Sequence, residues 1–498
     1  MLDGGVARSD ARAGFLRWLT VNVGTPASPA VRRASPYVTA GALSVIAAAM
    51  LTFSSSRQAG AGAVLVLALL FVLTAPPSAF IAGSVLFIGA EQIALRYSFS
   101  IGPGLVYGTD LFTLLVVLRG LLPKPRRAAY HIGAVGHVLI TLWIVVMVIG
   151  VVRGQAAGAG LNTALRDGLA LIYWPGLWFG FSRVMRERDF DAARAIRLSV
   201  FAAIGLIAYM LLMRAVNHPF ESVTQVGRLG EVVAANGQVF HRDFGFASAY
   251  IIYPALALFA LGQILYSNTR RFAWSVVAAL GVLATLLSLI RAEIYGLAAG
   301  AGVMLVISRD VHVRSGEVIR SRRLRTAGVL ALVLILFAVG LSAVSPSFAN
   351  VVGERSLPGF SHQSTAADEN AQYRLQALEA GLRVAREHTF GLGFISDQQV
   401  TAANVDPGYL AHSTPGFLLI YLGWPGLVAG VLALLGIFYE SARAPSPAPW
   451  VHPVLVGTLT MMAVYGFGAA GLVSQEFVIG LGALLVAARF AAVDTRGP

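Results

Sequence analysis

The stretch 408–430, "GYLAHSTPGFLLIYLGWPGLVAG", places one histidine between a polar turn and a long apolar run. The run is long enough to cross the roughly 30 Å hydrocarbon core of a bilayer as a helix. The letters "HSTPG" indicate the start of that helix, and Pro415 suits an early helical position. This stretch therefore predicts a membrane span over 412–437, with His412 at its mouth.

The whole chain has the composition of an integral membrane protein. Of its 498 residues, 57% are apolar and only 12% are charged, which is far from the average of soluble domains. We expect an all-α, polytopic fold with about 12 to 14 transmembrane helices, each covering about 17–25 residues. The expected spans are 37–53, 60–75, 77–95, 104–121, 131–152, 168–182, 195–215, 245–266, 271–290, 291–307, 325–345, 412–437, 450–469 and 472–490.

Basic residues predict the orientation of these spans. If the N-terminus is cytoplasmic, almost every cluster of positive charge falls on the inner side, as the positive-inside rule requires. The clusters contain Arg8, Arg12, Arg17, Arg32, Arg33, Lys124, Arg126, Arg127, Arg183 to Arg197, Arg270, Arg271, Arg309, Arg314, Arg320, Arg322, Arg323 and Arg325. We therefore expect a cytoplasmic tail over 1–35, a single membrane domain over 36–490 with outer loops 216–244 and 346–411, and a cytoplasmic tail over 491–498.

Charge and cysteine content exclude several classes of function. The net charge of +13 is spread over separate loops, so it does not indicate a nucleic-acid partner. Residues 1–35 lack the apolar core of a cleavable signal peptide. The chain has no cysteine, which excludes disulfides and thiolate metal sites.

The second outer loop contains a predicted amphipathic helix. Its start is signalled by Thr365 and Asp368, and Gly391 and Gly393 in "TFGLGF" end it. Helical spacing places apolar and charged side chains on different faces, so we expect the helix to lie flat on the outer membrane surface. The apolar face is Leu375, Leu378, Leu382 and Ala385, and the charged face is Glu379, Arg383 and Arg386.

Outward-facing arginines are candidates for binding an anion. Arg291 and Glu293 lie between two spans that leave almost no loop, where a charge needs a partner or a polar cavity. They form either a structural ion pair or part of an anion site, since guanidinium groups match phosphate oxygens two at a time. Arg242 has the same placement before the span 245–266, whereas Arg228 and Arg374 are equally consistent with solvated loop charges.

His412 has two interpretations. A histidine near a helix start is often a hydrogen-bonded structural residue. Its ordinary pKa near 6.5 also allows it to accept a proton at neutral pH. The preceding turn, "DPGY", and the helix start that follows would hold it at the outer surface.

These motifs resemble the O-antigen ligase and polymerase superfamily. "YRLQALEAGLRVAREHTFGLGF" followed by "AHSTPGFLLIYLGWPGLVAG" is similar to the C-terminal signature of that family. "LSLIRAEIYGLAAG" is similar to its serine-arginine-glycine segment, and "HRDFGFASAYIIYPALAL" to its arginine-glycine segment. The resemblance covers roughly residues 200–437 in the family's order. The departures from the pattern are Ser413 in place of asparagine, Ala292 and Glu293 in place of glycine, and a missing Asn-Pro-Asn near Phe246.

The resemblance implies a GT-C-like glycosyltransferase of the bacterial inner membrane, with its active site facing outside. Such an enzyme transfers glycan from a polyprenyl-pyrophosphate-linked donor to a glycan or lipid acceptor among membrane lipids, without a metal or other cofactor. Arg242 and Arg291 would stabilise the pyrophosphate leaving group, and His412 would act as the base, orient the acceptor or contact phosphate. Arg228, Arg374 and Glu293 are the further candidates for substrate binding.

Three other classes of protein compete with this interpretation. A metal-dependent nucleotide-sugar transferase needs paired carboxylates, but Asp189 and Asp191 in "RDFDAAR" have the pattern of a solvated, ion-paired cytoplasmic surface. The other large class, transferases of lipid-phosphate sugars, has an acidic first outer loop, which "SSSRQAG" (54–60) lacks. A transporter or flippase of lipid-linked glycans is the main alternative, with its polar pathway lined by Glu91, Asp110 and Glu476, although these residues are also consistent with structural contacts.

Overall fold

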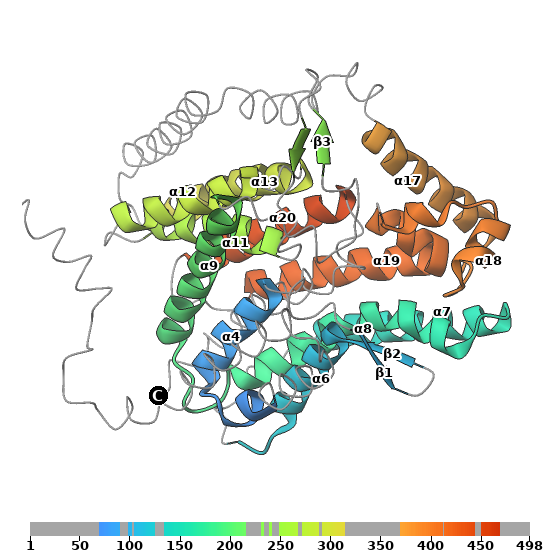
Figure 1. Cartoon of the computed structure of the whole chain (residues 1–498), viewed down its shortest axis with the longest axis horizontal. Helices are drawn as coiled ribbons and strands as arrows, with labels where there is room; N and C mark the ends of the chain where they lie inside the picture. Colours follow the sequence, from blue (N-terminus) through green and yellow to red (C-terminus); the bar gives the residue numbers. More distant parts are fainter. Residues whose placement is uncertain are drawn as a thin grey trace, which may run out of the picture. The chain divides into compact units, whose positions relative to one another are not determined.

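Helices dominate the computed structural model of the chain, which confirms the all-α class (Figure 1). The chain divides into two units, 1–75 and 76–498, and the first is described only over 69–75, which are helical through residue 74. The structure describes residues 69–89, 98–101, 104–124, 134–215, 231–233, 239–241, 249–266, 271–287, 291–313, 369–411, 413–443 and 450–468. All elements named below belong to the second unit.

Ten of the predicted spans are helices in this second unit. In chain order they are α4 (Pro77–Gly89), α6 (Gly108–Leu121), α7 (Ala134–Ala156), α8 (Leu161–Val184), α9 (Ala192–Ala215), α11 (Ala249–Tyr266), α12 (Arg271–Leu287), α13 (Arg291–Val313), α19 (Thr414–Arg443) and α20 (Val451–Gly468). The predicted spans 37–53, 325–345 and 472–490, and most of 60–75, lie outside the described residues.

The helices pack in three neighbouring groups. The first group contains α7 and α19, together with α17 (Glu369–Glu387), and it buries a large apolar cluster, which includes Trp143, Phe394 and Tyr421. A second group joins α11, α12, α13 and α20, and a third pairs α4 with α9 and α6 with α8. Contacts of α7 with α8, and of α19 with α20, connect the groups (Figure 1).

Two short hairpins interrupt the helices. Strands β1 (Ser98–Ile101) and β2 (Gly104–Tyr107) are antiparallel, with Ser98 opposite Tyr107. Strands β3 (Glu231–Val233) and β4 (Val239–His241) are also antiparallel, with Glu231 opposite His241. The first hairpin corrects the predicted span 104–121, because its first four residues form β2 and the helix begins at Gly108.

One helix among the described residues is long and apolar enough to cross a membrane by length and composition. It is the segment Thr414–Ala433 of α19, and 61% of it is buried inside the protein. Shorter apolar helical segments are Pro77–Phe87, Thr141–Ala156, Ile252–Leu265, Arg271–Leu286, Ala292–Ile307 and Val451–Gly466.

Candidate functional site around residue 412

The elements on both sides of residue 412 are described, whereas His412 itself lies outside the described residues. The short helix η3 (Pro407–Ala411) ends immediately before it, and α19 begins at Thr414. Arg228 and Arg242 also lie outside the described residues, with Arg242 directly following β4. The candidate site is therefore described through the elements around residue 412, which are α17, η3 and the start of α19. We call these elements the scaffold of residue 412.

Helix α17 forms one wall of this scaffold and packs against α19 through small residues. Ala377 is fully buried, and a Cβ on Gly416 would lie only 2.8 Å from the carbonyl oxygen of Ala377. Leu375, in contrast, is 54% exposed. The helix was predicted correctly, and Ala385 of the predicted apolar face is buried. Close backbone approach to α19 also buries Ala377, Ala380, Gly381 and Val384, which the prediction did not single out.

Polar side chains of α17 hold the segment that leads to residue 412. The Tyr373 hydroxyl donates to Asp406 Oδ2 at 2.6 Å, and its ring contacts the Tyr409 ring edge-on at 4.7 Å. Arg383 Nη2 donates to the carbonyl oxygen of Asn404 at 2.8 Å. Asp406 also accepts from the backbone N–H of Gly408 at 2.8 Å, which orders the turn before η3. This segment is thus attached to α17 at several points.

The Tyr373 contact predicts a pH-dependent contribution to stability. Burial, followed by the hydrogen bond and the charge of Asp406, raises the pKa of Tyr373 from 10.0 to about 12. The phenol keeps its proton longer in the folded than in the unfolded protein, so the contact stabilises fully below about pH 10 and is lost as the pH approaches about 12. We expect Tyr373→Phe to cost about 1 kcal/mol at neutral pH, where the phenol can donate to the carboxylate.

Thermal unfolding of wild-type and Tyr373→Phe protein from neutral to strongly alkaline pH measures this contribution. The gap between the two melting temperatures should stay constant up to about pH 10 and then narrow. A gap that does not change with pH would contradict the proposed role of the phenol proton. Tyr439→Phe, which alters an exposed tyrosine of α19, is the control.

Helix α19 is broken at Gly423, and the turn after α17 fills the break. Gly423 has φ 64° and ψ −155°, and Pro425 follows two residues later. In a continuous helix the carbonyls of Ile420 and Tyr421 would accept from residues 424 and 425, but proline has no N–H. The predicted span 412–437 is thus a helix with this break inside it, and the helix extends to Arg443.

Backbone groups of the turn Thr389–Gly393 pair with those freed at the break. The N–H of Leu392 donates to the carbonyl of Ile420 at 2.8 Å, and the N–H of Gly393 donates to that of Tyr421 at 2.9 Å. The Trp424 N–H donates in return to the carbonyl of Thr389 at 3.0 Å. We call residues 389–393 and 420–424 together the α19 joint.

The C-terminal end of α7 supports the other side of the α19 joint. Arg153 Nη2 donates to the carbonyl oxygen of Gly391 at 2.8 Å, and the Gly150 carbonyl accepts from the N–H of Phe394 at 3.1 Å. Arg153 was not among the predicted site residues. Its signal in the sequence is a basic residue at the expected outer end of the span 131–152, against the positive-inside pattern.

Ser413, which stands where the family that the sequence resembles usually has asparagine, has a structural role at the start of α19. Its hydroxyl accepts from the N–H of Gly416 at 3.2 Å, and its carbonyl accepts from the N–H of Phe417 at 2.9 Å. Ser413 is therefore the N-cap of α19, a position that serine and asparagine fill about equally well. Serine in place of the family's asparagine preserves the helix start beside residue 412.

Arg291, Glu293 and Arg374 are the predicted site residues that the structure describes. Arg291 is the first residue of α13, and Glu293 in the same first turn is only 1% exposed. Arg374 is half-buried on α17, adjacent to Tyr373. Helix α13 packs on α20, α20 on α19, and α19 on α17. Arg374 thus belongs to the scaffold of residue 412, and Glu293 lies on a helix connected to it through α20.

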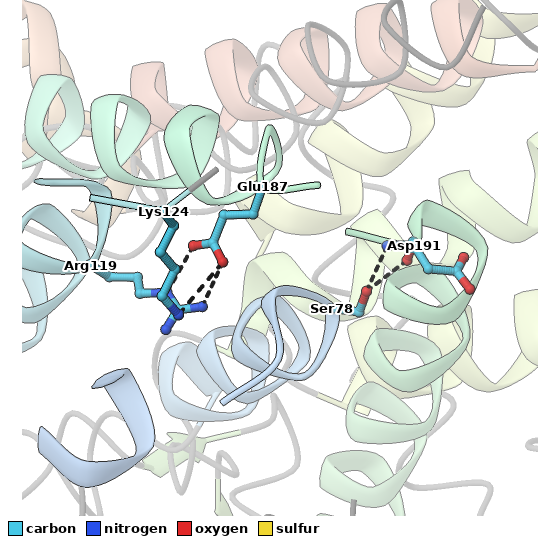
Figure 2. A network of polar contacts seen from close by, with 5 residues as sticks. All are labelled: Ser78, Arg119, Lys124, Glu187 and Asp191. Atoms are coloured by element: carbon cyan, nitrogen blue, oxygen red, sulfur yellow. Dashed lines mark hydrogen bonds and ion pairs between the residues drawn. The ribbon is translucent and has the colours of Figure 1, made fainter. Parts of the chain in front are cut away.

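Asp189 and Asp191, the two carboxylates considered as a metal-binding pair, have different surroundings in the loop between α8 and α9. Asp191 Oδ1 accepts from the N–H of Arg194 and caps α9, and the Asp191 backbone exchanges two hydrogen bonds with the Ser78 hydroxyl of α4 (Figure 2). Asp189 is exposed, as predicted. The loop was predicted to be a solvated, ion-paired surface. Glu187 in this loop is instead buried, with 4% exposure, and it pairs with Arg119.

The acidic residues that could line a transport pathway, Glu91, Asp110 and Glu476, do not form a cluster among the described residues. Asp110 lies in the first turn of α6 and is half-buried, while Glu91 and Glu476 lie outside the described residues. No group of three or more histidine or acidic residues arranged to hold a metal ion occurs among the described residues.

Comparison with known proteins does not add a relative. No known protein family matches the chain, and no curated protein matches it.

Proposed function

We propose that the protein is a polytopic glycosyltransferase of the bacterial inner membrane. It would polymerise or ligate surface polysaccharide from a polyprenyl-pyrophosphate-linked donor on the outer face, as enzymes of the O-antigen ligase and polymerase superfamily do. The observation that carries this proposal is the scaffold of α17, the α19 joint and the capped start of α19 on either side of residue 412. These elements follow the motif order of that family, and hydrogen bonds hold the described segments on both sides of residue 412.

Exposed apolar surface supports the membrane location. On α7, Val138, Val145, Val148 and Val152 are between 47% and 63% exposed, although Trp143 and Met147 of the same helix are buried. Similar exposed side chains occur on α6 and on the second half of α19, at Leu114, Leu118, Leu121, Val428, Val431 and Leu435. Soluble monomers rarely leave contiguous apolar areas of this kind open to water, so lipid is the solvent that fits them.

Glycine contacts between helices support the same conclusion. Helices α13 and α20 approach so closely that a Cβ on Gly300 would lie 2.5 Å from the carbonyl oxygen of Gly457. A Cβ on Gly296, one turn earlier, would lie 2.8 Å from the carbonyl oxygen of Met461. Small residues spaced four apart allow this approach and are typical of helices that associate in lipid.

The proposed chemistry divides the reaction among three side chains. In a direct displacement the acceptor hydroxyl attacks the anomeric carbon, the bond to the pyrophosphate breaks, and the anomeric configuration inverts. Arg242 and Arg291 would take up the negative charge that develops on the pyrophosphate. His412 would remove the proton of the acceptor hydroxyl. Arg374, on the helix that holds the segment before residue 412, and Glu293 would bind substrate.

A flippase for lipid-linked glycans is the second candidate, and the broken helix α19 is the observation that favours it. Transporters place ions and substrates at unwound segments whose backbone groups are left open. At the α19 joint, however, the carbonyls of Ile420 and Tyr421 and the N–H of Trp424 are all bonded to the turn. A break filled in this way is better suited to shaping a protein site than to binding a transported ion.

Transfer by the purified protein tests the proposal. Incubated in detergent with a polyprenyl-pyrophosphate oligosaccharide, the wild type should release polyprenyl pyrophosphate and form a longer or transferred glycan. Arg242→Ala, Arg291→Ala and His412→Ala should each lower turnover about tenfold or more, as loss of charge-stabilising or proton-transfer groups does. Arg271→Ala, which changes the first residue of α12 as Arg291→Ala does that of α13, is the matched control.

Two results would refute the enzyme. One is full activity in both Arg242→Ala and Arg291→Ala, which would remove the proposed pyrophosphate site. The other is a wild-type protein that moves the lipid-linked glycan across liposomes but transfers none in detergent, which would favour the flippase.

A further inference from the structure

The α19 joint connects three segments that are far apart in the chain. The turn Thr389–Gly393 bonds to α19 on one side and to the end of α7 on the other. Gly154 of α7 lies against the backbone of Phe394, because a Cβ at this glycine would overlap the Phe394 carbonyl oxygen. Directly after the turn, Phe394 is fully buried and its ring contacts that of Tyr421 at 5.3 Å.

A second contact from the same end of α7 continues along the segment toward residue 412. Gln399, in α18 (Asp397–Ala402), donates from Nε2 to the carbonyl oxygen of Ala157 at 2.8 Å. Ser396 and Gln399 form a capping box at the start of α18, which fixes the Gln399 side chain. From α18 the chain runs through residues 403–406 into η3 and to position 412.

Arg153 is the charged member of this arrangement. One guanidinium nitrogen, Nη2, donates to the Gly391 carbonyl, and another, Nε, is buried with no hydrogen-bond partner among the described residues. Gly391 has φ +69°, and its carbonyl lies in the turn that backbone hydrogen bonds join to α19. A charged donor makes a stronger hydrogen bond than a neutral one, so this contact is a strong link between α7 and the turn.

We infer that Arg153 is a positioning residue: its bond to Gly391 holds the α19 joint closed and thereby sets the place of the segment 396–411 that carries residue 412. Its part in catalysis rests on the proposed glycosyltransferase function, but its effect on the joint does not. The guanidinium acts on the turn and not on the reacting atoms, so it affects turnover through the placement of the histidine. Donor binding, which the other arginines provide, is largely unaffected.

Hydrogen exchange of the full-length protein in lipid nanodiscs tests this inference without any substrate. Arg153→Gln should speed amide exchange at Leu392 and Gly393, and across 404–411, by about tenfold, since exchange reports local opening and one charged hydrogen bond is lost. Arg153→Lys, which keeps a charged donor, should restore much of the protection. The control is Arg197→Gln, because exposed Arg197 bonds only to the Ala193 carbonyl of its own helix, at 3.3 Å, among the contacts described for it.

Transfer kinetics of the same preparations separate positioning from general instability. We expect Arg153→Gln to lower kcat about tenfold with the donor KM nearly unchanged, as for a group that orients the reacting residue. Unchanged exchange at Leu392, Gly393 and 404–411 in Arg153→Gln would overturn the inference. Faster exchange at the turn alone, with 404–411 still protected, would also overturn it. A wild type without transfer activity would refute the proposed function, while the exchange data would still decide the role of Arg153.

Discussion

The Gly423→Ala variant is expected to lose about 3 kcal/mol or more of stability, because two separate costs fall on one methyl group. Gly423 has φ 64° and ψ −155°, a backbone conformation that is nearly restricted to glycine. The added Cβ would also overlap the carbonyl oxygen of Thr389, which accepts the Trp424 N–H. Relief of either strain would require the turn to move away from α19.

Movement of the turn would expose several groups together. The carbonyls of Ile420 and Tyr421 would lose their bonds to Leu392 and Gly393, and the Trp424 N–H would lose its bond to Thr389. Pro425 has no N–H with which to replace the bond to Tyr421. Buried backbone groups that lose a partner cost about 1–3 kcal/mol each. The variant should therefore unfold at a lower temperature than the wild type and give less folded protein on extraction from membranes.

Thermal unfolding in detergent at a fixed scan rate measures the effect. Gly302→Ala in α13 is the matched control, since a Cβ there meets nothing within 4 Å. This change should be neutral or stabilise by up to about 1 kcal/mol, the usual gain from alanine inside a helix. Equal melting temperatures for Gly423→Ala and Gly302→Ala would mean that α19 is not broken in the way described.

Helix positions were the most predictable part of the fold. The predicted span 131–152 corresponds to α7 at Ala134–Ala156, and 195–215 to α9 at Ala192–Ala215. A long apolar run bounded by charges is a property of the local sequence alone. The composition in a sliding window is therefore enough to find it. The membrane placement of those helices stays a prediction.

Helix faces and pairings were less predictable, because they depend on which segments meet in space. On α17 the leucines are the larger apolar side chains, yet small residues pack on α19 because they permit a closer approach. The break in α19 did have a local signal, the glycine and proline of "GWPG". Its partner, the turn after α17, could only be identified from the folded chain.

In the candidate site, too, features set by the local sequence were predictable, whereas contacts between distant segments were not. Gly391 and Gly393 were predicted to end α17, but the helix already ends at Glu387. The two glycines, with φ values of +69° and +79°, belong to the turn that follows it. The N-cap at Ser413 follows from local sequence as well. Arg153 was missed because it contacts Gly391 across 238 positions of the chain, and no periodic pattern links residues that far apart.

The second large effect is expected at the buried ion pair between α6 and the loop after α8. Arg119 is fully buried, with Nε 3.0 Å from Glu187 Oε1 and Nη2 2.9 Å from Oε2, and Lys124 Nζ lies 3.7 Å from Oε2 (Figure 2). Glu187→Gln removes the negative charge that pairs with the buried guanidinium. Breaking a buried pair in this way costs about 3–5 kcal/mol.

Lys124 adds to this cost. Burial, and then the positive charge of Arg119, lower the pKa of Lys124, whereas Glu187 raises it. Without the carboxylate, the positive charge of half-buried Lys124 would act on the fully buried guanidinium of Arg119 with less compensation. We therefore expect Glu187→Gln to unfold at a clearly lower temperature, whereas Asp189→Asn, an exposed carboxylate in the same loop, should stay within about 0.5 kcal/mol of the wild type.

A double variant distinguishes charge compensation from packing. Arg119→Met with Glu187→Leu removes both charges and keeps apolar volume, and such replacements are often neutral or stabilising. If Glu187→Gln is strongly destabilised and the double variant recovers, the uncompensated guanidinium is the cause. If the double variant is as unstable as Glu187→Gln, the stability comes instead from the packing and hydrogen bonds of the two side chains. These link α6 to a loop that lies 68 positions later in the chain. A Glu187→Gln protein as stable as Asp189→Asn would show that Arg119 finds another anionic partner or water.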